Sequence, residues 1–292
     1  AVLRAAAYSS PMAAFQDEMA GIGYYQFIEK LEKDFEQRKE ETVEELCKLM
    51  KKILRPENFM ISYTGERESM ETVQKLAGAV KAGLGTEPVE KSEEKLTCTK
   101  KNEGFKTSGQ VQYVAQTGNF KKKGLEYTGA LEILKVILSY DYLWMNLRVK
   151  GGAYGCMSSF LRTGDSYFVS YRDPNLAKTN AVYEKIPEYV ASFDPDERDM
   201  TKYIIGTFGA LDTPLNPEAK GSRSMAAYLE HLTYEEIQKE RDEILTATPA
   251  DIRSLSDLIA SILSDQCLCV VGNEHAIREE SGMFTSIQGL CE

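Results

Sequence analysis

The order of elements along the chain repeats, and this repetition constrains the fold more than any single motif does. Residues 24–31 open a long helical region, which is followed by a strand-like run at residues 59–66. Residues 226–232 open a second helical region, which is followed by an apolar, strand-like run at residues 267–274. The two runs end in the similar sequences G-E and G-N-E. Matching order and spacing favour a duplicated unit over a chance match.

The two copies differ in what precedes them. Two or more strand-like segments precede the second copy, but only residues 1–23 precede the first. The first unit therefore lacks its opening half, so we expect either that another chain or segment completes it or that the sequence is a trimmed piece. We predict an α/β fold of two homologous units, with mixed or antiparallel sheets packed against helices. The predicted parts are an incomplete first unit at residues 1–85, a linker at 86–107 and a second unit at 108–292.

Hydrophobic periodicity places the individual elements. The sequence predicts helices at residues 24–50, 69–81, 125–149, 176–192, 196–209, 222–232, 233–245 and 249–263. It predicts strands at residues 58–65, 111–116, 154–161, 166–171 and 267–272, and a short tail after the last strand. Residues 86–107 are rich in Lys, Glu, Thr and Gly, which is typical of a solvated linker. An edge strand near Lys95 to Thr99 is the alternative.

Composition and charge exclude several classes of protein. Hydrophobic residues make up 42% of the chain and charged residues 27%, as in a globular protein with a packed core. The net charge of −10 opposes binding to nucleic acid or to anionic membranes. The six cysteines form no C-x-x-C pair, which favours free thiols in a reducing compartment, either the cytoplasm or an organelle matrix. A disulfide or a metal role remains the alternative for them.

The common catalytic motifs are absent from the sequence. His231 and His275 are its only histidines, and neither stands in an H-E-x-x-H or H-x-x-E-H motif. A G-x-S-x-G nucleophile motif and a phosphate-binding G-x-x-x-x-G-K-[ST] motif are also missing. We therefore predict no metal site in this chain, and no catalytic machinery is evident in it.

The segment at residues 147–155, L-R-V-K-G-G-A-Y-G, has two interpretations. It is typical of a helix end, where basic residues suit the helix dipole and a glycine adopts the left-handed conformation. It is also suited to binding, because glycines allow close backbone approach, and Arg148 and Tyr154 can donate hydrogen bonds to a carbonyl or an oxyanion.

This segment resembles the glycine-rich Arg/Tyr motif of the insulinase and pitrilysin superfamily of zinc metallopeptidases, peptidase family M16. Three other segments, at residues 10–15, 21–27 and 170–175, resemble the presequence protease and falcilysin branch more narrowly. The resemblance covers nearly the whole chain. It implies an α+β sandwich fold, with four homologous domains in two halves that close around a peptide. Zinc and the catalytic Glu are expected in an H-x-x-E-H motif of the N-terminal half, which this sequence lacks.

The resemblance implies that residues 1–85 end a third domain and residues 108–292 form the fourth, non-zinc domain of a zinc metalloendopeptidase. Arg148 and Tyr154 would then bind the substrate carbonyl and stabilise the oxyanion, while Gly151, Gly152 and Ala153 contact the substrate. The chain would hold no cofactor and would be inactive alone. Its partners would be the zinc-containing N-terminal half of the same polypeptide and unstructured, extended peptides. A structural role is expected for Asp173 to Asn175, with Asp173 or Asn175 capping a helix.

Two other functions remain open at this point. The chain can be a non-catalytic structural or processing-partner subunit of the same superfamily, in which the fold persists without the metal site. It can instead be a small-molecule-binding α/β protein, for which an enclosed apolar pocket would be expected.

Overall fold

The structure, a computed structural model, describes residues 1–89, 96 and 98–290. The chain forms two compact units. Unit 1 comprises Ala1–Phe27, Lys95–Asp212 and Gln238–Glu292, and unit 2 comprises Ile28–Glu94 and Thr213–Ile237. No helix in the described part of the chain has both the length and the apolar character needed to cross a membrane.

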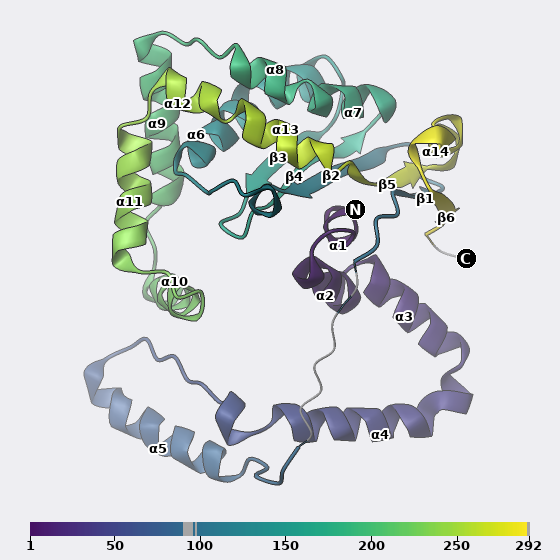
Figure 1. Cartoon of the computed structure of the whole chain (residues 1–292). Helices are drawn as coiled ribbons and strands as arrows, with labels where there is room; N and C mark the ends of the chain where they lie inside the picture. Colours follow the sequence, from purple (N-terminus) through teal and green to yellow (C-terminus); the bar gives the residue numbers. More distant parts are fainter. Residues whose placement is uncertain (90–95, 97, 291–292) are drawn as a thin grey trace. The chain divides into compact units, whose positions relative to one another are not determined.

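Unit 1 is built on a six-stranded mixed sheet (Figure 1). The strands follow the order β3-β4-β2-β5-β1-β6, so β3 and β6 are the edges of the described sheet. Their bounds are β1 Glu103–Thr107, β2 Gln112–Asn119, β3 Gly155–Phe160, β4 Asp165–Asp173, β5 Cys267–Asn273 and β6 Ser286–Gly289. Strand β1 pairs in parallel with β5 and β6, whereas the pairs β2–β4, β2–β5 and β3–β4 are antiparallel. The predicted mixed α/β fold class is confirmed.

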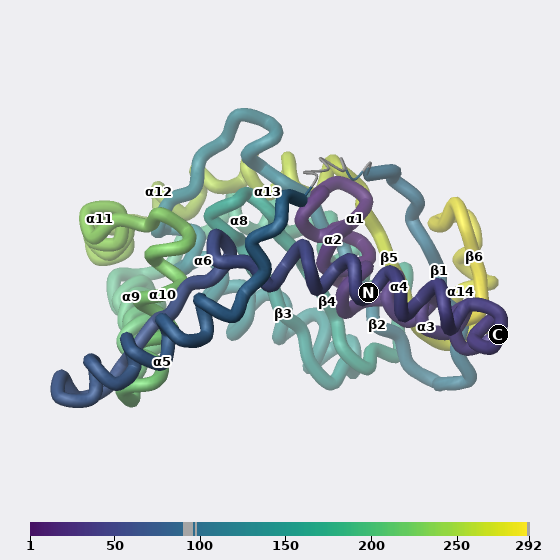
Figure 2. Tube along the Cα trace, turned by 90° about the horizontal axis from the view of Figure 1, so that it is seen from below, coloured from purple at the N-terminus to yellow at the C-terminus, as the bar shows by residue number. Residues whose placement is uncertain are grey.

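Side chains alternate between two cores on opposite faces of this sheet, as the period-two geometry of strands requires. Val114 contributes to the larger core and Ala115, the next residue of β2, to the smaller one. Helices α6 (Ala130–Ile137), α7 (Ala177–Glu184), α8 (Ile186–Ala191), α12 (Pro249–Ser254) and α13 (Ser256–Ser264) supply the larger core. Helix α1 (Val2–Ala7) covers the other face, and α2 (Pro11–Ala20) packs against α1 (Figures 1 and 2).

The remaining elements complete the two units. Unit 1 also holds α9 (Glu197–Leu211), α14 (Glu274–Glu279) and most of α11 (Tyr234–Leu245), while α4 (Phe35–Ile53), α5 (Met70–Ala82) and α10 (Pro217–Leu229) belong to unit 2. Helix α3 (Ile22–Lys33) begins in unit 1. Short 3₁₀ turns occur at η1 (Pro56–Asn58), η2 (Arg67–Ser69), η3 (Lys121–Lys123) and η6 (Ser281–Met283).

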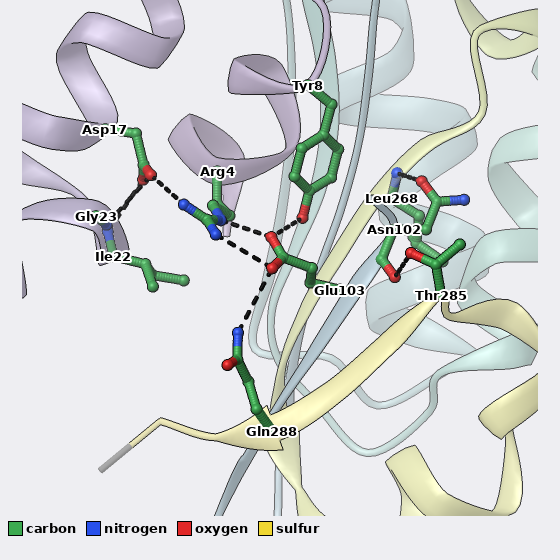
Figure 3. Close-up of polar contacts among 10 residues, drawn as sticks. All are labelled: Arg4, Tyr8, Asp17, Ile22, Gly23, Asn102, Glu103, Leu268, Thr285 and Gln288. Atoms are coloured by element: carbon green, nitrogen blue, oxygen red, sulfur yellow. Dashed lines mark hydrogen bonds and ion pairs between the residues drawn. The ribbon is translucent and has the colours of Figure 1, made fainter. Parts of the chain in front are cut away.

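A buried ion network fixes the N-terminal helices to the sheet (Figure 3). Arg4 of α1 donates to both carboxylate oxygens of Glu103, at 2.6 and 3.1 Å, and to Asp17 at 2.9 Å. The hydroxyl of Tyr8 donates to Glu103 at 2.9 Å. Asp17 and Glu103 are 2% and 3% exposed, so Arg4 compensates two carboxylates that have almost no contact with water. The network therefore joins α1 and α2 to β1, and through β1 to the rest of unit 1.

This network explains why the units differ from the predicted parts. The sequence groups residues 1–27 with the first unit, but their contacts place them in unit 1 with the sheet. The expected linker contains β1, at residues 103–107, which pairs with β5 and β6. Lys95 and Thr97 of the alternative edge strand lie outside the described residues.

Several predicted elements have different bounds in the structure. The helix expected at residues 125–149 begins at Ala130, and the one expected at 176–192 is interrupted at Lys185, just before Pro187. The helix expected at 249–263 is likewise interrupted at Leu255. The expected tail contains α14 and β6, which lie beside β1 (Figure 2).

Unit 2 buries little of its apolar surface. Helices α4, α5 and α10 contain no buried residue, and Val43, Leu46 and Leu49 of α4 are each half exposed or more. The strand expected at residues 58–65 does not form, since the described residues of unit 2 offer it no strand to pair with. An amphipathic helix is normally stabilised by packing its apolar face, so unit 2 has the properties expected of an incomplete unit.

Replacing Arg4 with alanine is expected to destabilise unit 1 by about 3–5 kcal/mol, because two buried carboxylates lose their cation. Thermal denaturation of Arg4→Ala beside Arg38→Ala measures this, since Arg38 of α4 is partly exposed and pairs with the exposed Glu41. The Arg38 variant is expected to stay within about 0.5 kcal/mol of the parent chain. Equal stability of the two variants would show that the network does not hold α1 and α2.

Amides of α4 and α5 are expected to exchange with deuterium much faster than those of β5 and α13. The reason is that local opening costs least where few apolar contacts are lost. Hydrogen exchange of the 292-residue chain, read by mass spectrometry, tests this. Protection of α4 equal to that of β5 would contradict the description of unit 2 as incompletely packed.

Candidate functional site

The helix that leads into the predicted Arg/Tyr motif ends in two π-helical stretches. Helix α6 continues into η4 (Leu138–Tyr142) and η5 (Trp144–Val149). The amide of Lys150 donates to the carbonyl of Met145 at 3.0 Å, which is the i to i−5 bond of a π-turn. Such wide turns are rare and occur often at functional sites. Within η5, Leu147 packs into the core while Arg148 is exposed, so the stretch anchors one side and presents the other to solvent.

The turn after η5 accounts for both glycines of the motif. The amide of Gly152 donates to the carbonyl of Arg148 at 3.0 Å, and Gly152 has a φ of +81°, in the left-handed region. A Cβ at Gly151 would lie 2.5 Å from the carbonyl oxygen of Leu147. The helix-end interpretation therefore explains why both residues are glycine. Contact of Gly151 and Gly152 with a substrate backbone stays a prediction.

Ala153 has a packing role. Its side chain is 3% exposed and belongs to the larger core, and its amide donates to the carbonyl of Leu147 at 2.9 Å. The side chain of Ala153 is thus enclosed by protein and its amide is used by the turn, while contact of this residue with substrate stays a prediction.

Arg148 and Tyr154, the two predicted donors, come together on an exposed surface. Tyr154 immediately precedes the edge strand β3, and its amide donates to the carbonyl of Tyr171 at 3.1 Å. Its side chain is 63% exposed. The guanidinium carbon of Arg148 lies 4.1 Å from the ring centroid of Trp144 and 5.9 Å from that of Tyr154. Stacking on Trp144 orients the guanidinium without an ion pair.

A second arginine, which the sequence interpretation assigned no role, belongs to the same cluster. The guanidinium carbon of Arg172 lies 5.9 Å from the ring centroid of Tyr154 and 5.6 Å from that of Tyr171. The pairing of β2 with β4 shifts register between Gln112 and Val114, so β4 carries a bulge at this point. Arg172 has a φ of +48°, a conformation that costs a non-glycine residue roughly 1–2 kcal/mol. In the sequence, Arg172 was marked only by its place in the segment at residues 170–175, which resembles the presequence protease branch.

The segment that follows Arg172 holds the glycine turn in place. Asp173 is fully buried and accepts hydrogen bonds from the amide of Asn175 at 2.8 Å and from the hydroxyl of Thr179 at 2.6 Å. The side chain of Asn175 donates to the carbonyl of Gly151 at 2.7 Å. The predicted structural role of this segment is confirmed. The predicted helix cap is wrong, because no side chain caps a backbone amide of α7: Asp173 bonds to the hydroxyl of Thr179 and Asn175 to the carbonyl of Gly151.

The site is positively charged although the chain as a whole is acidic. Among the described residues, no Asp or Glu side chain forms an ion pair with Arg148 or Arg172. The side chain of Tyr113, which hydrogen-bonds to Arg172, raises the pKa of that arginine. Burial raises the pKa of the Cys156 thiol to about 11, although Arg148 opposes this shift. Cys156 is therefore a neutral thiol at physiological pH and no thiolate nucleophile.

The described residues do not fit a zinc site. Nowhere in residues 1–89, 96 and 98–290 do three or more His, Cys, Asp or Glu side chains cluster so that they could hold a metal ion. His231 is exposed at the end of α10 with a φ of +54°, and His275 is exposed and pairs with Glu279 at 3.3 Å. Neither histidine lies in the Arg148–Tyr154 cluster.

A family model described as the PreP C-terminal domain matches residues 102–273, which include every residue of this cluster. The chain belongs to the PreP C-terminal domain family. It is 40% identical to protein HypA of Clostridium perfringens over its whole length, and 32% identical to presequence protease 1, chloroplastic/mitochondrial, of Arabidopsis thaliana over 83% of its length. The resemblance to the C-terminal portion of the presequence proteases is thereby confirmed.

The chain spans less than a third of these relatives, 30% of HypA and 23% of the Arabidopsis protein. Two solved structures, a protease from Helicobacter pylori and pitrilysin, are similar at 16% and 14% identity, with TM-scores of 0.48 and 0.47. They match 69% and 70% of this chain and 52% and 23% of their own chains. With TM-scores below 0.5, they add nothing to the family assignment.

Replacing Gly152 with alanine is expected to destabilise the PreP C-terminal domain by roughly 1–2 kcal/mol, because alanine is strained at a φ of +81°. The matched control is Gly209→Ala in α9, where an added Cβ meets no atom within 4 Å. That change is expected to stabilise the helix by roughly 0.5–1 kcal/mol. Chemical denaturation of both variants measures the difference, and equal effects would show that the turn does not need its glycine.

Proposed function

We propose that this chain is the non-zinc, substrate-binding C-terminal part of a presequence-protease-like peptidase that degrades unstructured peptides. The observation that carries the proposal is the convergence of Arg148 and Tyr154 on one exposed surface beside an edge strand. A helix end alone accounts for the glycines but leaves the exposed, stacked donors without a purpose.

The proposed chemistry is electrostatic. When a peptide carbonyl is attacked, its oxygen becomes negatively charged, and donors already in place stabilise that charge. Arg148 supplies a permanent positive charge and several N–H groups, and Tyr154 supplies one O–H group. The stacking of Arg148 on Trp144 and the backbone bonds of Tyr154 hold both donors before a substrate arrives. These residues would therefore bind the transition state more tightly than the ground state.

The edge strand offers a way to hold peptides of different sequence. Strand β3 follows Tyr154 directly and has β4 as its one partner in the described sheet. An extended peptide that adds to such an edge is bound through its main chain, with little dependence on side chains. A peptide paired with β3 would run past Tyr154 and Arg148.

The N-terminal half of the same polypeptide is the proposed partner, and zinc is expected there. The family model is that of a C-terminal domain, and the relatives named above are more than three times longer than this chain. The apolar side chains that α4 and α5 leave exposed support a further segment packing on unit 2. A reducing compartment, the cytoplasm or an organelle matrix, is the proposed location.

Replacing Arg148 with alanine or Tyr154 with phenylalanine is expected to lower kcat/KM for peptide cleavage about 10²- to 10³-fold in the full-length protein, as loss of one oxyanion donor does. The controls are Arg198→Ala and Tyr140→Phe, which change exposed residues outside the cluster and are expected to leave kcat/KM unchanged. The 292-residue chain alone is expected to cleave no peptide.

Circular dichroism separates loss of rate from loss of fold. Unchanged cleavage by a folded Arg148→Ala protein would refute the proposal. A full-length protein that lacks an H-x-x-E-H motif would instead be a structural or processing subunit.

A further inference from the structure

The left-handed backbone conformation of Arg172 is the feature of the site that folding does not explain. It occupies the left-handed position of the β4 bulge, where glycine would fit without strain. Bulges next to active sites commonly redirect a side chain, and here the redirected side chain lies over the rings of Tyr154 and Tyr171. A strained residue that persists where a relaxed one would fold better indicates a function for its side chain.

The charges around Arg172 indicate what this side chain binds. The carboxylate of Asp173, its neighbour in sequence, is fully buried and occupied by Asn175 and Thr179. In the described part of the chain, therefore, no acidic side chain neutralises Arg172 or Arg148. Both guanidinium carbons lie 5.9 Å from the centroid of the same ring, that of Tyr154. Each guanidinium therefore lies beside one exposed ring without a carboxylate partner among the described residues, which favours binding of an anionic group of a ligand there.

We propose that Arg172 binds a carboxylate of the peptide whose carbonyl Arg148 and Tyr154 hold. Guanidinium groups bind carboxylates through paired N–H donors, and their planar shape suits this geometry better than an ammonium group does. The carboxylate belongs either to an acidic side chain or to the C-terminus of the peptide. The inference rests on the proposed function, to which it adds a preference among peptides.

The chain contains its own reporter for a binding experiment. Trp144 is the only tryptophan of the sequence and stacks on Arg148 at 4.1 Å, so its fluorescence responds to a ligand at the cluster. The experiment titrates the 292-residue chain with three forms of one short peptide of glycine, alanine and serine. The first form is acetylated and amidated, the second also carries one central glutamate, and the third has a free C-terminus.

The variants of Arg172 separate the effect of its guanidinium group from the effect of its backbone strain. Arg172→Gly removes the guanidinium and relaxes the backbone, so its melting temperature is expected to equal or exceed that of the parent chain. Arg172→Lys keeps the charge but loses the paired donors. Arg198→Ala is the matched control, since it removes an exposed arginine of α9 outside the cluster.

The expected result is selective. One or both of the carboxylate peptides bind the parent chain about ten-fold more tightly than the neutral peptide, as a charged hydrogen bond implies. Arg172→Gly removes this preference and Arg172→Lys reduces it. The affinity of the Arg172 variants for the neutral peptide, and that of Arg198→Ala for every peptide, stay within two-fold of the parent chain. The peptide whose tighter binding is lost in Arg172→Gly identifies the source of the carboxylate, either an acidic side chain or the C-terminus.

Three results would overturn the inference, and they are distinguishable. If peptides bind in a manner that depends on Arg148, but equally with or without a carboxylate, this inference fails and the proposed function stands. If Arg172→Gly folds and binds all three peptides as the parent does, Arg172 has no role in recognition. Absence of any binding to the parent chain would count against both the inference and the proposed function.

Discussion

The site depends on the hydrogen bonds that join the glycine turn after η5 to the end of β4. Exposed Arg and Tyr side chains have many rotamers, so only a fixed backbone can bring them together reproducibly. The amide of Tyr154 is held by the carbonyl of Tyr171, and the carbonyl of Gly151 by the side chain of Asn175. Buried Asp173 in turn holds Asn175. A helix end and a strand end, distant in sequence, thus act as one rigid support.

The two charged clusters of unit 1 contrast in a way that separates folding from function. Arg4, Asp17 and Glu103 are nearly buried and paired with one another, and their pairing attaches α1 and α2 to the sheet. Arg148 and Arg172 are exposed, stacked on aromatic rings and unpaired with any carboxylate among the described residues. The first arrangement satisfies its charges internally. The second leaves charge available to a ligand, and Arg172 does so in a strained conformation.

Elements with a clear hydrophobic period could be predicted from the sequence, whereas those defined by pairing could not. Strand β5 followed from its apolar run, β2 and the hairpin of β3 and β4 from strand-like segments, and Arg148 and Tyr154 from their motif. Strand β6, S-I-Q-G, has only one large apolar residue and exists because β1 pairs with it. Residues 59–64 have the apolar composition of a strand, but the described residues of unit 2 form no strand beside them. The proposed role of Arg172 depends on a bulge, which is a property of strand register and leaves no mark in local composition.

The most direct measurement of the central claim is a structure of the full-length protein, inactivated in its N-terminal half and bound to an uncleaved peptide. The guanidinium of Arg148 and the hydroxyl of Tyr154 are expected to lie within about 2.7–3.1 Å of a peptide carbonyl oxygen. The peptide is expected to run in extended form along β3. A peptide bound elsewhere, with both side chains in contact with solvent alone, would contradict the claim that this surface binds the substrate.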